Sequence, residues 1–137
     1  MNPIKSEVLE RKKGIILREL KILEEVQKKY NQGIRDEILE HAMCHAMQNA
    51  ISAIIDISHH IVVERRGDAP ESYSEAISAL GDLGILKREF ADSYSRVAKL
   101  RNVLVHLYDN IDIDFLFSLI TPFRQDTKVF LTHIQGI

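Results

Sequence analysis

The segment from Arg101 to Tyr108 carries a guanidinium, an imidazole and a phenol within an otherwise apolar stretch. At the helical period of about 100° per residue, Arg101 and Tyr108 point toward the same broad apolar face as Leu104. An arginine on such a face loses hydration but keeps its charge, so it requires an anionic or hydrogen-bonding partner. The imidazole of His106 can exchange protons near neutral pH. These three groups together suit phosphate chemistry without a metal.

The expected direction of His106 differs from that of Arg101 by about 140° around a continuous helix. Such a helix cannot aim both side chains at one atom. Either the helix loosens near Val105, or each site combines residues from two subunits. We favour the second alternative, which predicts a homodimer.

The elements that position these residues are expected to be helices, because apolar residues recur at helical spacing and alternating runs are nearly absent. The fold class expected is an all-α, up-down bundle of four long helices and one short helix. Gly33 suits the end of the first helix, and Ser72 or Ser74 can cap the short one. The predicted helices cover residues 5–30, 35–64 and 87–107, and a short one runs through Ala76, Ile77 and Leu80. A fifth begins near Phe115 and should be kinked or split by Pro122.

The second predicted helix carries a polar stripe with little charge opposite its apolar face. Its members are His41, His45, Gln48, Ser52, Asp56 and His59. Three interpretations stay open: a polar seam in a dimer interface, a contribution to the site with Asp56 or His59 beside Arg101, and a metal site. The metal site would use His41 and His45, which have the spacing found on zinc-binding helices, although no HExxH core accompanies them.

Composition narrows the class of protein. The chain has 137 residues, of which 45% are hydrophobic and 28% charged, and these values predict one globular domain over 1–137. The formal net charge of −2 argues against a protein that coats DNA or RNA electrostatically. Cys44 is the only cysteine, which fits a reducing compartment. With no signal peptide or membrane span recognisable in the sequence, a soluble, cytoplasmic protein is expected.

Four stretches in this order resemble a known family. They are Ala50–Ile61 (AISAIIDISHHI), Pro70–Tyr73, Gly84–Leu86 and Leu100–Asp109 (LRNVLVHLYD). The last contains Arg, four residues, His, one residue and Tyr. Together they resemble the HepT-like branch of the HEPN proteins, the toxin half of minimal nucleotidyltransferase toxin–antitoxin pairs. The resemblance covers residues 37–120.

That resemblance implies a dimeric helical bundle and a metal-independent endoribonuclease, with no cofactor, in a type VII-like toxin–antitoxin pair. It implies RNA as the substrate and a nucleotidyltransferase antitoxin as the partner. Arg101 and His106 would be catalytic, and the antitoxin would attach AMP to Tyr108. Asp56, Asn102 and His59 would be supporting residues.

The chemistry is consistent with this assignment, because RNA supplies its own nucleophile in the 2′-hydroxyl group. His106 would move a proton, and Arg101 would bind the phosphate through paired donors. The alternative is a non-catalytic helical dimer that binds a nucleotidyltransferase or a nucleotide. In that case Arg101 would form a structural pair with Asp56, and His106 would only cap a helix.

Overall fold

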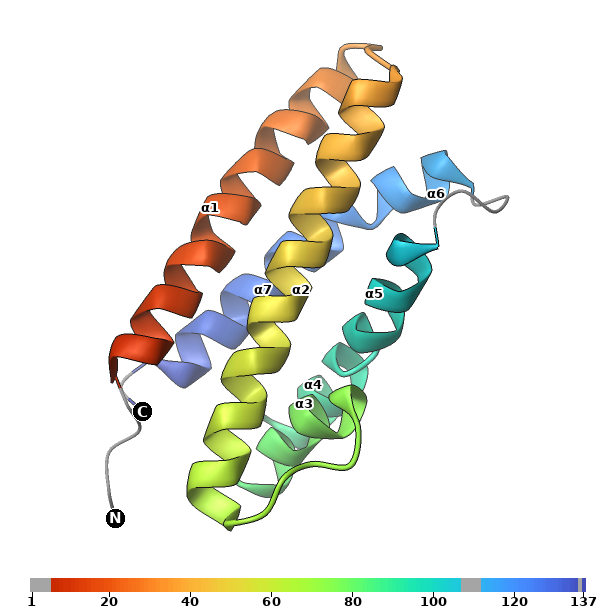
Figure 1. Ribbon diagram of the computed structural model, residues 1–137. Coiled ribbons are helices and arrows are strands. Elements are labelled where there is room, and N and C mark those ends of the chain that lie inside the picture. The colour runs from red at the N-terminus through yellow and green to blue at the C-terminus, as the bar shows by residue number, and fades with distance from the viewer. Residues whose placement is uncertain (1–5, 107–111, 136) are drawn as a thin grey trace.

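A long antiparallel hairpin of two helices is the largest feature of the fold (Figure 1). The computed structural model describes residues 6–106, 112–135 and 137. Helix α1 covers Ser6–Asn31 and α2 covers Glu37–Arg66. The turn between them uses Gly33 at a φ of 90°, a conformation that glycine adopts without steric cost. The carboxylate of Asp36 accepts a hydrogen bond of 2.8 Å from the backbone N–H of Leu39 and so caps α2.

The remaining helices are shorter and pack around this hairpin. Their bounds are α3 Tyr73–Asp82, α4 Arg88–Tyr94, α5 Val97–Val105, α6 Ile113–Ser118 and α7 Ile120–Ile134. Helices α3 and α4 lie near the C-terminal end of α2, while α5 runs back beside α2 (Figure 1). Helix α7 packs against α1. This arrangement places α5 against the central helix of the bundle.

The apolar face of α2 forms the centre of the core, as its periodicity predicts. The apolar residues of α2 that are 0% exposed are Met43, Met47, Ala50, Ile51, Ile54, Ile57, Ile61 and Val62. A buried hydrogen bond of 2.8 Å between the hydroxyl groups of Tyr94 and Thr127 joins α4 to α7. Every regular element in the described residues is a helix, so the all-α prediction is confirmed. No described helix is both long and apolar enough to cross a membrane.

Two of the predicted long helices are each broken into two, which corrects the predicted boundaries. The first break is at Ser95 and Arg96, where the N–H of Arg96 donates to the carbonyl of Ser93 and so closes a tighter turn. The second is at Leu119, whose N–H donates to Leu116. Pro122 therefore lies in the first turn of α7, where its missing N–H costs no helical hydrogen bond.

Candidate active site

Helix α5 carries Arg101 and is attached to α2 by two side-chain hydrogen bonds. The hydroxyl of Ser52 accepts a bond of 2.9 Å from Nε of Arg101. The amide of Gln48 donates a bond of 3.3 Å to the carbonyl of Leu104. Both donor and acceptor on α2 belong to the predicted polar stripe. Part of that stripe is therefore a contact between two helices of the same chain.

The guanidinium of Arg101 is half-buried and keeps its charge without a carboxylate partner. None of the ion pairs among the described residues includes Arg101. Its Cζ atom lies 6.0 Å from the centre of the Tyr73 ring, at the start of α3. A cation supported by a neutral hydroxyl and an aromatic ring is not internally neutralised. It can therefore bind an external anion such as a phosphate.

His106 is the residue that caps the C-terminus of α5, and its side chain is exposed. Its backbone N–H donates a bond of 3.2 Å to the carbonyl of Val103. The helix predicted to continue through Leu107 instead ends at Val105. The offset of about 140° was counted along a continuous helix, and α5 is continuous from Arg101 to Val105, with His106 as its C-cap at φ −102° and ψ 34°. Tyr108, the predicted AMP site, lies outside the described residues.

Among the described residues, no hydrogen bond or ion pair joins Arg101 to the side chains of the predicted supporting residues Asp56, Asn102 and His59. Asp56 forms an ion pair of 2.8 Å with Lys12 of α1, and its side chain is 51% exposed. Ser52, one turn earlier on α2, occupies the position at Arg101 that had been expected for Asp56. Asn102 and His59 are exposed. Arg101 therefore has a neutral partner where the sequence suggested a negatively charged one.

The two histidines considered as metal ligands have other neighbours. Nε2 of His41 lies 3.9 Å from the carboxylate of Glu37, one turn away. Nε2 of His45 lies 3.0 Å from the side-chain amide of Asn49. In the part of the chain that the structure describes, no three His, Cys, Asp or Glu residues are grouped so that they could hold a metal ion.

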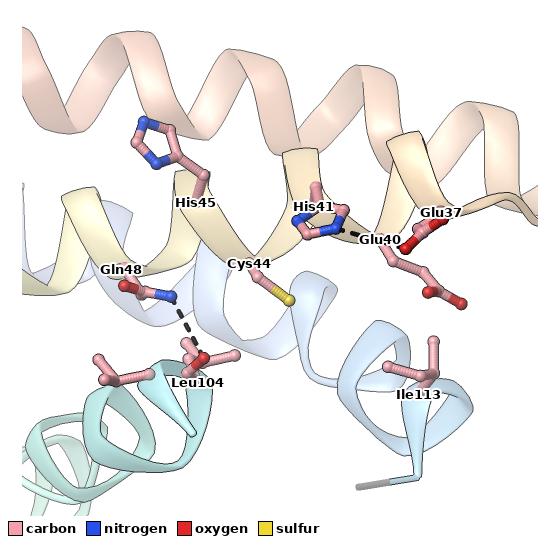
Figure 2. A pocket seen from close by; sticks show the side chains of 9 residues that line it. Glu37, Glu40, His41, Cys44, His45, Gln48, Leu104 and Ile113 are labelled. Carbon is pink, nitrogen blue, oxygen red and sulfur yellow. Dashed lines mark hydrogen bonds and ion pairs between the residues drawn. The ribbon is translucent and has the colours of Figure 1, made fainter. Parts of the chain in front are cut away.

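A cavity of about 340 Å³ lies between α2, the C-terminal end of α5 and the start of α6 (Figure 2). Its lining includes the carboxylates of Glu37 and Glu40 and the apolar side chains of Leu104 and Ile113. Burial, followed by the charge of Glu40, raises the pKa of the Cys44 thiol in this wall to about 11. His41 and His45 also line the cavity, but its two carboxylates disfavour a phosphate there. Of the two places, Arg101 is the better one for an anion.

Sequence reasoning missed two residues that contact Arg101. Ser52 stood in the polar stripe, and its place one turn before Asp56 was the available signal. Tyr73 appeared only within the Pro70–Tyr73 stretch of the resemblance, and nothing in its spacing connected it with α5. Both contacts depend on how α2, α3 and α5 pack together.

Comparison with known proteins identifies a family over most of the chain. The family described as "Ribonuclease HepT-like" matches residues 16–134. One relative, named "mRNA nuclease HepT", comes from Shewanella oneidensis; it is 22% identical over 131 residues, or 96% of this chain and 98% of the relative. Another, named "tRNA nuclease HepT", comes from Aphanizomenon flos-aquae; it is 32% identical over 90 residues, or 66% of this chain and 61% of the relative.

Solved structures share the fold. A toxin–antitoxin structure with AMP-PNP superimposes with a TM-score of 0.87 at 21% identity, covering 96% of this chain and 99% of the other. A tri-AMPylated Shewanella oneidensis HEPN toxin, solved in complex with its MNT antitoxin, gives a TM-score of 0.86 at 23% identity, with 100% of both chains covered. These likenesses confirm the HEPN-like helical bundle. Since the family match also extends over nearly the whole sequence, this chain belongs to the HepT-like ribonuclease family.

Proposed function

We propose that this protein is a metal-independent endoribonuclease and the toxin of a toxin–antitoxin pair. The observation that carries the proposal is Arg101, a half-buried cation whose hydrogen-bond partner is the neutral hydroxyl of Ser52. Membership in a ribonuclease family and relatives named as mRNA and tRNA nucleases support RNA as the substrate. The guanidinium would bind the scissile phosphate and stabilise the negative charge that develops on it.

The proposed reaction uses the 2′-hydroxyl of the RNA as the nucleophile. Its oxygen forms a bond to the adjacent phosphorus, and the bond from phosphorus to the 5′-oxygen breaks. His106, exposed at the end of α5, either removes the 2′-hydroxyl proton or protonates the leaving 5′-oxygen. The products would be a 2′,3′-cyclic phosphate and a 5′-hydroxyl group, and no metal-bound water is required.

The test compares Arg101→Ala and His106→Ala with two matched controls, Arg11→Ala and His133→Ala. The controls remove an arginine from α1 and a histidine from α7, and both of these side chains are exposed. Total RNA and a labelled oligonucleotide are incubated with each protein in EDTA, and the product ends are identified. We expect the first two variants to lose cleavage with unchanged circular dichroism, while the controls cut normally. Cleavage by both active-site variants in EDTA would refute the assignment, and so would failure of the unmodified protein to cut RNA.

We further propose that the partner is a minimal nucleotidyltransferase antitoxin that attaches AMP to Tyr108. Structural neighbours described as a tri-AMPylated HEPN toxin with an MNT antitoxin support this proposal. AMP on the motif tyrosine would add bulk and negative charge where an RNA phosphate must bind. Intact-mass spectrometry after incubation with ATP and a candidate minimal nucleotidyltransferase should show added AMP, and Tyr108→Phe should lose one increment. If the protein with Tyr108 in place shows no change of mass after this incubation, the proposal is contradicted.

We also propose that the active form is a homodimer. Two apolar side chains of α5 support it, since Val103 is 43% exposed and Val105 is 47% exposed beside the site. Burial of such residues against a second subunit is favourable. Light scattering at micromolar concentration should give twice the mass of 15.7 kDa. A monomer that cuts RNA at the full rate would exclude a dimeric site.

The roles predicted for Asp56, Asn102 and His59 remain proposals. Asn102 and His59 are exposed, so each could contact the RNA or a second subunit. Asp56 would act on Arg101 only indirectly, because its ion pair is with Lys12. Asp56→Asn, Asn102→Ala and His59→Ala should each lower cleavage less than Arg101→Ala does. If one of these variants loses as much cleavage activity as Arg101→Ala does, the residue would be assigned a catalytic role.

A further inference from the structure

The ring of Tyr73 is an exposed aromatic surface beside the candidate phosphate-binding residue. Its side chain is 58% exposed, and its ring centre lies 6.0 Å from Cζ of Arg101. Phe115 is equally exposed, at 57%, but no cation among the described residues lies over its ring. Isolated exposed apolar side chains are common and need no explanation. The position of Tyr73 against a cation that lacks a carboxylate partner distinguishes this ring.

The first turn of α3 holds the Tyr73 backbone through several polar contacts. The hydroxyl of Ser72 accepts a bond of 3.1 Å from the N–H of Glu75 and caps the helix. The carboxylate of Glu75 accepts a hydrogen bond from the N–H of Glu71 and pairs with Arg66 at 3.2 Å. Arg66 is the last residue of α2, so this turn is fastened to the central helix. An aromatic ring on an ordered turn loses little conformational freedom when it binds a ligand.

The two side chains together offer what one nucleotide unit of single-stranded RNA requires. A guanidinium binds phosphate, and an exposed aromatic ring provides a flat surface on which a base stacks. Because every base has a flat face, stacking of this kind tolerates different sequences. The chain has a net charge of −2 and so lacks the strong overall positive charge that holds RNA non-specifically. Local stacking beside one arginine would compensate for that lack.

We propose that Tyr73 forms a nucleobase subsite, in which a base of single-stranded RNA stacks on the ring while Arg101 binds the adjoining phosphate. This inference rests on the proposed ribonuclease function. It assigns Tyr73 to substrate binding and gives it no part in proton transfer. Loss of the ring should weaken RNA binding by about five- to a hundredfold, the range measured when stacking aromatics are removed.

The experiment is a double-mutant cycle between the ring and the base. Binding of short fluorescent RNAs is measured by anisotropy with the full chain carrying His106→Ala, which prevents cleavage. Tyr73→Leu removes the ring at similar volume, Tyr73→Phe retains it, and Phe115→Leu is the matched control. Each RNA has one nucleotide replaced by an abasic unit, at every position in turn. We expect one abasic position to weaken RNA binding by the protein that retains Tyr73 but not by Tyr73→Leu. Tyr73→Phe and Phe115→Leu should show the same weakening at that position as the protein that retains Tyr73.

Salt dependence separates stacking from electrostatic effects. Tyr73→Leu should keep the slope of log affinity against log salt, because the phosphate contact remains. Arg101→Ala should reduce the magnitude of that slope by about 1, the change expected when one phosphate contact is lost. The subsite would be overturned if the losses of binding free energy from removing the ring and from removing the base were additive at every position. A change in the oligomeric mass of Tyr73→Leu would overturn it too. If Tyr73→Leu binds and cuts RNA normally, only the subsite fails; if the unmodified protein cuts no RNA, the proposed function itself fails.

Discussion

Replacing Ser52 by alanine tests directly whether α2 positions the guanidinium. The change removes the hydroxyl that accepts the 2.9 Å bond from Nε of Arg101. A hydrogen bond to a charged group contributes about 1.5–3 kcal/mol. Because Arg101 is only half-buried and water can replace part of the bond, we expect the lower end of this range. A barrier raised by about 1.4 kcal/mol corresponds to a tenfold fall in kcat.

The assay is cleavage of a labelled RNA under saturating conditions, with kcat and KM determined separately. Ser52→Thr retains a hydroxyl at the same place and should recover most of the rate. Ser58→Ala is the matched control, because Ser58 is a serine of the same helix whose hydroxyl bonds to Ile54 at 2.8 Å, away from α5. It should lower the free energy of unfolding without changing kcat.

Two results would refute the reasoning about Ser52. One is a kcat for Ser52→Ala within twofold of the unmodified protein. The other is an equal loss of kcat in Ser58→Ala, because the effect would then reflect the stability of α2 and not the direction of Arg101. In either case the hydrogen bond at Arg101 would have no part in catalysis.

Three further predictions concern the bundle. The raised pKa of Cys44, about 11, predicts that the thiol is alkylated at pH 8 about a hundredfold more slowly than a free thiol. It also predicts that the free energy of unfolding falls as pH rises from about 9 to 11. Alkylation as fast as that of a free thiol, followed by mass spectrometry, would contradict this prediction. Tyr94→Phe should lower the unfolding free energy by about 1 kcal/mol by leaving the hydroxyl of Thr127 unpaired, and an unshifted urea midpoint would count against it. Lys12→Ala should cost under about 1 kcal/mol, because its ion pair with Asp56 is partly exposed; a larger loss in urea denaturation would show a stronger pair.

The start and end signals of several helices could be read from the sequence because they depend on local chemistry. Gly33 adopts the left-handed conformation, and Ser72 caps α3, as predicted. Asp112 caps α6, because its carboxylate accepts a bond of 3.2 Å from the backbone N–H of Phe115. Each of these interactions joins residues no more than a few positions apart, so residue type alone indicates them.

The break at Ser95 and Arg96 was not predicted, because nothing in the local sequence required it. Ser95 and Arg96 both keep helical backbone angles, and the break consists only of hydrogen bonds that span three residues in place of four. A tighter turn rotates the chain further for each residue, so helical directions counted along residues 87–107 as one helix cannot be carried across the break into α5. A split of the last helix was one predicted outcome, but it was expected at Pro122 and lies three residues earlier, at Leu119. Pro122 was expected to kink or split this helix from within, although its position also suits the first turn of a helix.

The partner of Arg101 was left open in the sequence, where Asp56 beside Arg101 was one of three interpretations of the polar stripe. A carboxylate four residues beyond Ser52 on the same stripe appeared to be the better match for a cation. Lys12 of α1 binds Asp56 instead, and the antiparallel packing of α1 and α2 brings these two residues together. Competition between Lys12 and Arg101 for one carboxylate is a property of tertiary structure. The sequence of either helix alone does not contain it.

The neutral support beneath Arg101 has a practical consequence for anyone who handles this protein. Among the described residues this guanidinium has no carboxylate counterion, so we expect small oxyanions to compete with the proposed RNA phosphate for it, and screening extends over about 8 Å at physiological salt. Sulfate and inorganic phosphate in a storage or assay buffer would occupy the same position and act as competitive inhibitors. Chloride or acetate buffers of low concentration are therefore the appropriate medium in which to judge its activity.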